Sequence, residues 1–139
     1  MDETFQPAPT GRRAARAAAV QALYEADITG HPGVSVVRRL AREAGLAAGL
    51  VNFAVALVER VEADRASLDS RIMQAAPVFP SDQLAAVDRN ILRVALAELE
   101  TRQDTPRSVV INEAVEIAKL FGSEGAPGFV NGVLGSVLG

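Results

Sequence analysis

Apolar residues recur at spacings of three and four along most of the chain, which is the period of helices buried on one face. The clearest run begins near residue 11 and is rich in alanine. Its apolar seam is formed by Ala15, Ala18, Ala19, Ala22, Leu23 and Ala26. The stretch "TGHPG" at 29–33 ends the run, with Gly30 as a C-cap. We expect a first helix from residue 11 to this turn, with a narrow face that lets other helices approach closely.

The same period predicts five further helices. Their expected ranges are 34–45, 46–61, 62–76, 82–102 and a segment that opens at Pro106 and runs through "INEAVEIAKLF". Ser81 is the expected N-cap of the fifth helix, with Asp82 in its first turn, where an acid is favourable. Thr105 is the expected cap of the sixth helix, and Pro106 its first residue. "PVFP" at 77–80 breaks the chain between the two halves.

The last segment, "FVNGVLGSVL", fits two structures. Asn131-Gly132 between apolar residues is a hairpin signal. The flanking apolar residues also fit a helix that Pro127 could open, and with six helices before it we predict a seventh. In a helix Gly132 costs about 1 kcal/mol in propensity, and we expect the close approach of a neighbouring helix to explain it.

Composition supports an all-α protein. Of 139 residues, 49% are hydrophobic but only 4% are aromatic, and alanine-rich, aromatic-poor chains favour packed helices over sheets. We expect residues 1–10 to form a flexible arm and residues 11–139 to form one domain. The absence of cysteine, of a signal-peptide pattern and of a long apolar run predicts a soluble, cytoplasmic protein.

The residue types needed for catalysis are not brought together by the pattern. The single histidine, His31, lies in a turn between Gly30 and Pro32 and reads as a surface residue. Glu113 and Glu116 could share a metal on one helix face, but a solvated face with Glu116 paired to Lys119 is favoured. We therefore expect no enzymatic activity, no metal and no cofactor, and a binding function becomes the leading class.

Arginines crowd the start of the first helix, where cations are unfavourable against the helix dipole. Arg13 and Tyr24 point within roughly 20° of each other around the helix, with Arg16 and Gln21 to either side. Arginine, an amide and a phenol on one face suit RNA, because guanidinium groups bind phosphate and aromatic rings stack on bases. A merely solvated arginine run is the alternative. The net charge of −3 argues against non-specific binding to duplex DNA.

Other charged positions remain open at this stage. Arg38, Arg39 and Arg42 could extend a basic surface, but an exposed helix face is favoured. Arg89 and Arg93 form a like-charged pair that nearby acids, on the same or another helix, could neutralise. Asp88 lies at the edge of an apolar stripe and is either satisfied internally or directed at a partner.

Three segments resemble the family of the bacterial transcription antitermination factor NusB. They are "RRAARAAAVQALYEAD" at 12–27, "VDRNILRVALAEL" at 87–99 and "VVINEAVEIAKLFGSEGAPGFVNGVL" at 109–134. They follow the family's order and spacing, whereas 34–80 is similar in length and helical character more than in identity. The resemblance implies an all-α fold of about seven helices in two subdomains, here 11–76 and 81–139, and no catalysis.

The resemblance also implies partners and a task. Family members bind single-stranded boxA RNA together with NusE, the ribosomal small-subunit protein, within an RNA polymerase complex that contains other Nus factors. The complex suppresses termination, notably in ribosomal RNA operons. A possible homodimer is also compatible with the family.

Site residues follow from the resemblance position by position. The implied RNA-binding residues are Arg12, Arg13, Arg16 and Phe121, with Gln21 added from its place on the first helix and Tyr24 near the junction of RNA and partner surfaces. The implied partner-binding residues are Tyr24, Asp82 and Asp88. Glu113, Asn112 and Asn131 belong to the motifs and read mainly as packing and hydrogen-bonding residues.

The chain departs from the family pattern in places. Its N-terminal arm is acidic, Gly125 replaces an acid beside the expected RNA path, and Ala97 replaces an aromatic. Two other functions stay open: a structural helical adaptor or homodimer, and the NusB-like RNA-binding module of an RNA cytosine methyltransferase.

Overall fold

The computed structural model describes residues 8–76, 84–101 and 104–138, and these residues form α-helices without any strand. In chain order the helices are α1 (Gly11–Thr29), α2 (Gly33–Glu43), α3 (Ala48–Ala63), α4 (Arg65–Ala75), α5 (Ala86–Thr101), α6 (Arg107–Phe121) and α7 (Ala126–Leu138). The all-α prediction is therefore confirmed, with seven helices in the described part of the chain.

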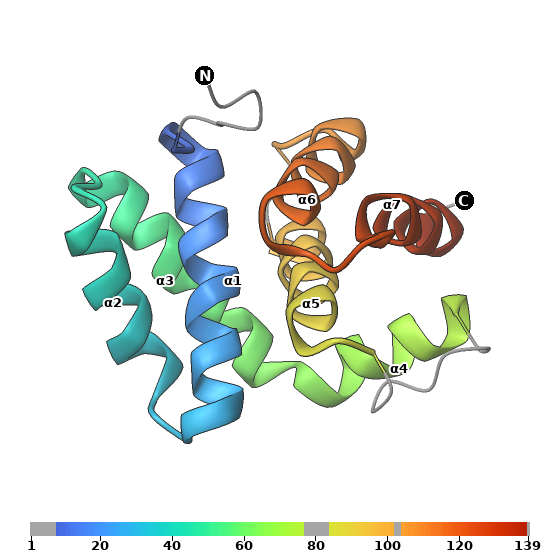
Figure 1. Ribbon diagram of the computed structural model, residues 1–139, viewed down its shortest axis with the longest axis horizontal. Helices are drawn as coiled ribbons and strands as arrows, with labels where there is room; N and C mark the ends of the chain where they lie inside the picture. The colour runs from blue at the N-terminus through green and yellow to red at the C-terminus, as the bar shows by residue number, and fades with distance from the viewer. Residues whose placement is uncertain (1–7, 77–83, 102–103, 139) are drawn as a thin grey trace.

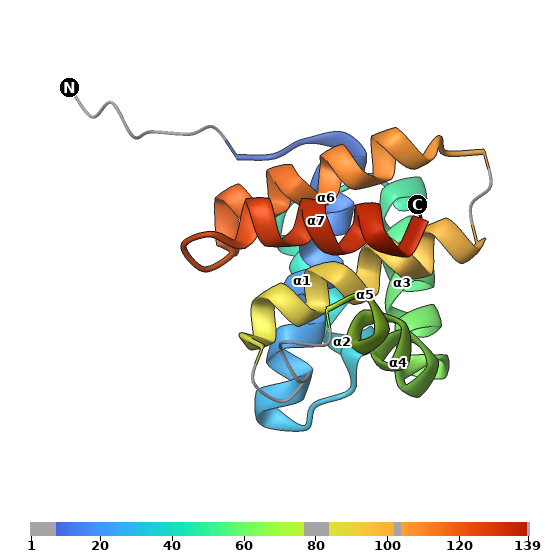
Figure 2. The same cartoon turned by 90° about the vertical axis from the view of Figure 1, so that its right-hand side faces the viewer.

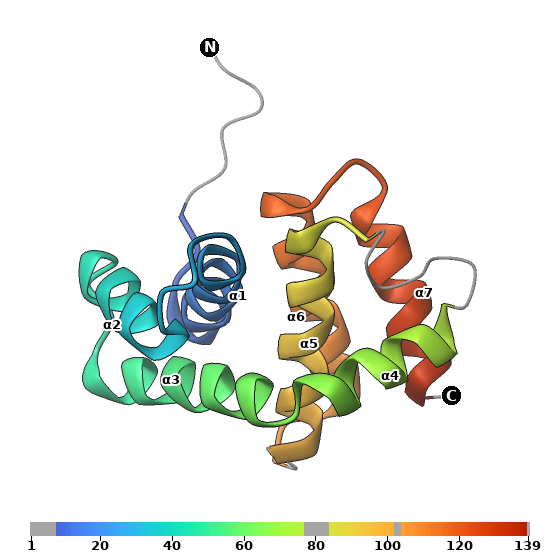
Figure 3. The ribbon, with the colours of Figure 1, turned by 90° about the horizontal axis from the view of Figure 1, so that it is seen from below.

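The helices form two groups that share one core. α1, α2 and α3 pack on one another, and α5, α6 and α7 form the second group, with α4 against α5 and α7 (Figure 1). α3 and α4 follow each other along one edge of the molecule and link the groups (Figure 3). α1 and α3 also pack on α5, so apolar residues of both groups belong to the same buried cluster.

The alanine seam of α1 makes the close packing possible. Ala15, Ala19 and Ala22 are fully buried, and Leu23 supplies the large side chain at their end. Small side chains let neighbouring helix axes approach, so α1 contacts α2, α3 and α5 along its length. Gly30 caps the helix in the left-handed conformation at φ 78°, and its N–H donates to the Ala26 carbonyl at 2.9 Å.

Two helix starts differ from the prediction. α5 begins at Ala86, and Leu84 and Ala85 precede it, whereas Ser81 and Asp82 lie outside the described residues. α6 begins one residue later than expected, with Pro106 as its N-cap. Thr105 is buried, and its hydroxyl oxygen has no hydrogen-bond partner, so it does not cap the helix.

α7 is a helix and not a hairpin, and it lies beside α6 (Figure 2). Val130 and Leu134 are fully buried on its inner face. The expectation that Gly132 permits close approach of another helix is wrong. A Cβ built at this position has no other atom within 4 Å, because the residue faces away from the core.

A polar network joins the groups at the other end of α1. Arg93 of α5 donates two hydrogen bonds, of 2.7 and 2.8 Å, to the Asp69 carboxylate of α4. It also lies 3.4 Å from Asp27 of α1, which accepts from Asn90 at 2.9 Å and pairs with Arg65 at 3.0 Å. The acids of other helices thus explain Arg93, as the sequence allowed.

Candidate nucleic-acid interface

Arg16 is buried between the two helix groups. Its Nε and Nη2 each donate to the Glu98 carboxylate of α5 at 2.7 Å, and its Nη1 lies 3.4 Å from Glu113 of α6. The guanidinium also sits 5.4 Å from the centre of the Phe53 ring. With 6% of its side chain exposed, Arg16 differs from the expected RNA-facing arginine, because its side of α1 docks on α5.

Arg13 lies at the surface beside Arg16. Its Nε and Nη2 donate to the two oxygens of Glu113, at 3.2 and 2.7 Å, and 40% of its side chain is exposed. The hydrogen bond to Glu113 raises the pKa of the Arg13 guanidinium, so the group stays charged. Because Glu113 holds both Arg13 and Arg16, it fixes the start of α1 against α6.

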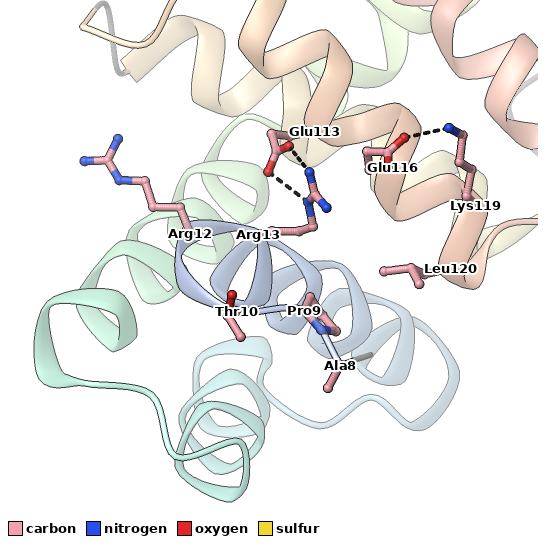
Figure 4. Close-up of a pocket in the computed structure, with 9 residues that line it drawn as sticks. All are labelled: Ala8, Pro9, Thr10, Arg12, Arg13, Glu113, Glu116, Lys119 and Leu120. Carbon is pink, nitrogen blue, oxygen red and sulfur yellow. Dashed lines mark hydrogen bonds and ion pairs between the residues drawn. The ribbon is translucent and has the colours of Figure 1, made fainter. Parts of the chain in front are cut away.

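Arg12 points away from Arg13 and Glu113 (Figure 4). Its guanidinium lies over the ring of Phe53 on α3, 5.1 Å from the ring centre. No carboxylate among the described residues lies within ion-pair distance of Arg12. A stacked, uncompensated guanidinium keeps its donors available for an anion.

A groove of about 740 Å³ separates the start of α1 from α6. It is lined by Ala8, Pro9, Thr10, Arg12, Arg13, Glu113, Glu116, Lys119 and Leu120 (Figure 4). Glu116 pairs with Lys119 at 2.7 Å, as predicted, and this contact lowers the pKa of the Glu116 carboxyl. In the described part of the chain no cluster of His, Asp or Glu side chains could hold a metal ion.

The remaining predicted RNA residues lie outside this groove. Gln21 and Tyr24 are exposed further along α1, and 37% of Tyr24 is accessible. Phe121 is half-buried against the core at the end of α6, next to Leu120 of the groove. The structure therefore brings Arg12 and Arg13 together with α6, while Gln21 and Tyr24 form a separate surface.

Asp88, one of the predicted partner residues, is buried and satisfied within the chain. Its carboxylate accepts from the backbone N–H of Ser123 at 3.2 Å and from the Ser123 hydroxyl at 2.6 Å. These bonds attach the loop between α6 and α7 to the start of α5. Of the two roles that the sequence left open, the geometry provides the internal one. Asp82 lies outside the described residues.

Sequence reasoning missed Glu98 and Phe53, which position the arginines. Glu98 is 1% exposed although it is charged. Its place inside the apolar run "VALAEL" is a signal of internal pairing, since a buried carboxylate needs a partner. Phe53 carried no comparable signal, because an aromatic in an apolar helix is ordinarily a core residue.

The NusB family profile matches residues 13–138, almost the whole of this helical assembly. The chain belongs to the NusB family. It is 44% identical over 128 residues to the transcription antitermination protein NusB of Dehalococcoides mccartyi, covering 92% of this chain and 90% of that protein. It is 38% identical to the protein of the same name from Geotalea uraniireducens, covering 92% and 94%.

Solved structures agree with the family assignment. T. maritima NusB superposes with a TM-score of 0.85 at 29% identity, over 92% of this chain and 90% of the other. A structure described as the antitermination factors NusB and NusE in complex with double-stranded RNA gives a TM-score of 0.78 at 28% identity, over 91% and 94%. The relatives are named as transcription factors and not as enzymes or methyltransferases, which agrees with the predicted non-enzymatic role. In the described residues no helix is long and apolar enough to cross a membrane.

Proposed function

We propose that this chain is an RNA-binding transcription antitermination factor that uses the groove between α1 and α6. The observation that supports this most directly is Arg12, which is exposed, stacked on Phe53 and without a carboxylate partner among the described residues. Arg13 and Lys119 line the same groove. Family membership and the RNA-bound complex of a related NusB point in the same direction.

The chemistry favours a single strand of RNA. Arg12 can bind a phosphate or stack on an unpaired base, because its guanidinium is planar and carries several donors. It lies over the Phe53 ring, 5.1 Å from the ring centre. Arg13 uses Nε and Nη2 for Glu113, so its Nη1 remains available for a phosphate oxygen. In this proposal Arg16 does not touch RNA. It positions α1 so that Arg12 and Arg13 line the groove.

The proposed RNA is a boxA-type element, and the proposed protein partner is NusE, the ribosomal small-subunit protein. Tyr24 is exposed and can form a direct contact at the junction of RNA and partner. Asp88 contributes indirectly, because it holds Ser123 and the loop before α7. The proposed task is to join RNA polymerase and other Nus factors in the cytoplasm and suppress termination, notably in ribosomal RNA operons.

The test is binding of a short boxA-type RNA and a scrambled RNA, each with and without purified NusE. We expect sequence-dependent binding that strengthens when NusE is present. Arg12→Ala is expected to weaken RNA binding. It is also expected to reduce the log–log salt slope, that is, the slope of the logarithm of the binding constant against the logarithm of the salt concentration, by about 0.7, which corresponds to the loss of one phosphate contact in a single strand. Arg107→Ala is the matched control, since Arg107 is another exposed arginine that lines none of the grooves described here.

Two results would contradict the proposal. Equal binding of both RNAs in the presence of NusE would remove the specific function and favour an adaptor or a homodimer. An unchanged salt slope in Arg12→Ala, with binding intact, would place the RNA elsewhere on the protein.

A further inference from the structure

Apart from Arg89, which has an interaction partner of its own, the described arginines of this acidic chain divide into two classes. Most of those described lie within 4.0 Å of a carboxylate: Arg13, Arg16, Arg39, Arg60, Arg65, Arg71 and Arg93. Within the described ranges four arginines have no such neighbour, namely Arg12, Arg38, Arg42 and Arg107. Although the net charge of the chain is −3, only a few of the described arginines lack a neighbouring acid, and their location is informative.

Three of these four arginines lie along one continuous path. The groove between α1 and α6 shares Arg12 with a second groove of about 480 Å³, which runs over Phe53 to Asn52 on α3. Asn52 in turn belongs to a third groove of about 420 Å³ between α2 and α3. Arg38 and Arg42 line this third groove.

The third groove has the composition of a phosphate-binding surface. Arg38 and Arg42 are exposed and lie four residues apart on one face of α2, a spacing that is mildly unfavourable without an anion between them. Its other lining residues are Leu46, Ala48, Val51 and Asn52. No acid lines this groove or the second one, and α3 has no acid in its first turn.

We propose that an RNA strand bound at Arg12 continues over the N-terminal turn of α3 onto α2, where Arg38 and Arg42 bind its phosphates. This inference rests on the proposed RNA-binding function. RNA is favoured over an acidic protein segment because the path is continuous with the groove that already carries that function. Neither Arg38 nor Arg42 has an aromatic neighbour in the third groove, so this extension recognises the backbone and not the base sequence.

The test compares a short boxA-type RNA with the same RNA carrying an oligouridine tail at its 5′ or its 3′ end. Wild-type protein is expected to bind one of the tailed RNAs on the order of tenfold more tightly than the short RNA, since two more phosphate contacts are made. The variant Arg38→Ala/Arg42→Ala is expected to lose this gain and about 1.4 of the log–log salt slope on that RNA. Its affinity for the short RNA is expected to be unchanged.

Controls separate this inference from the proposed function. Arg107→Ala removes an equally uncompensated arginine outside the path and is expected to keep the gain from the tail. A tail of equal length and mixed base sequence is expected to act like the oligouridine tail, since base identity is not read here.

Several outcomes would overturn the inference. They are a tail that gives no gain at either end, a gain that persists in the double variant, and an equal loss on short and tailed RNA. In each case specific binding of the short RNA would leave the proposed function standing. If Arg38→Ala/Arg42→Ala binds NusE more weakly than wild type in the absence of RNA, the third groove would be assigned to the protein partner instead. If wild-type protein binds no RNA at all, the proposed function fails and this extension fails with it.

Discussion

At the scale of single residues, the buried pair of Arg16 and Glu98 makes a strong stability prediction. Their side chains are 6% and 1% exposed, so removing one charge leaves the other unpaired inside the protein. We expect Arg16→Ala to lower the free energy of unfolding by about 3–5 kcal/mol. Arg13→Ala, which removes a 40% exposed partner of Glu113, is expected to cost less than about 1 kcal/mol. Chemical denaturation measures both, and similar losses would contradict the assigned burial.

The bond between Asp88 and Ser123 gives a second residue-scale prediction. Hydrogen bonds to a charged group contribute about 1.5–3 kcal/mol, so Asp88→Ala is expected to destabilise the fold by about that amount. Ser123→Ala is expected to cost less, because the backbone N–H still donates to Asp88. The double variant should then cost less than the sum of the two, since both changes remove the same contact. If Asp88 serves only a partner, Asp88→Ala will weaken NusE binding and leave stability unchanged.

Contacts within one helix could be predicted from the sequence, and contacts between distant helices could not. The sequence indicated that arginines at a helix start are unfavourable and assigned Arg16 to RNA, whereas the structure pairs Arg16 with Glu98, 82 residues away. Pairing over such distances depends on tertiary packing, which the local pattern of one helix does not encode. Glu116 with Lys119 was predictable because both lie within one turn of the same helix.

At the scale of secondary-structure elements, α7 contains more glycine than its packing requires. Gly132 and Gly135 are exposed, and a Cβ at either position would meet no other atom within 4 Å. We expect each Gly→Ala change to raise the free energy of unfolding by about 0.5–1 kcal/mol, because alanine loses less backbone entropy in a helix. Thermal unfolding checks this. A loss of stability would show that something packs against this face.

The network around Asp27 predicts a dependence on pH. Burial alone would raise the pKa of the Asp27 carboxyl. The hydrogen bond from Asn90 and the charges of Arg65 and Arg93 outweigh burial and hold the pKa of the Asp27 carboxyl below its ordinary value. A lowered folded-state pKa means that the ionised form stabilises the fold above that value and that this contribution is lost as pH falls through the folded-state pKa.

The matching variant is Asp27→Asn. It is expected to be less stable than wild type at neutral pH, and the difference is expected to shrink as the pH falls through the lowered pKa of Asp27. Denaturant unfolding of Asp27→Asn and wild type at neutral and at acidic pH measures the difference in the free energy of unfolding. A gap that stays constant with pH would mean that Asp27 does not titrate as its surroundings require.

Helix periodicity predicted the elements well and their ends less well. The C-cap at Gly30 was predictable because a positive φ of 78° favours glycine. The start of α6 was missed by one residue: Pro106 is the N-cap, and the buried Thr105 hydroxyl makes no hydrogen bond. Whether a threonine hydroxyl caps or packs depends on neighbours that are distant in sequence.

At the scale of the whole molecule, one buried cluster spans both helix groups. We therefore expect a single cooperative unfolding transition in urea, with Tyr24 fluorescence from α1 and far-UV circular dichroism from all helices giving the same midpoint. Two separated midpoints would instead indicate that the groups fold as independent units.

The groove between α1 and α6 is built from residues 8–13 and 113–120, which lie about a hundred positions apart. During translation, residues 8–13 on one side of the groove are therefore synthesised long before residues 113–120 on the other side. Until α6 has emerged from the exit tunnel, Arg13 has no Glu113, and the start of α1 is held by Phe53 of α3 and Glu98 of α5 but not by α6. We expect nascent chains that stop before residue 113 to bind RNA more weakly than chains that include α6, because one wall of the groove is missing from them.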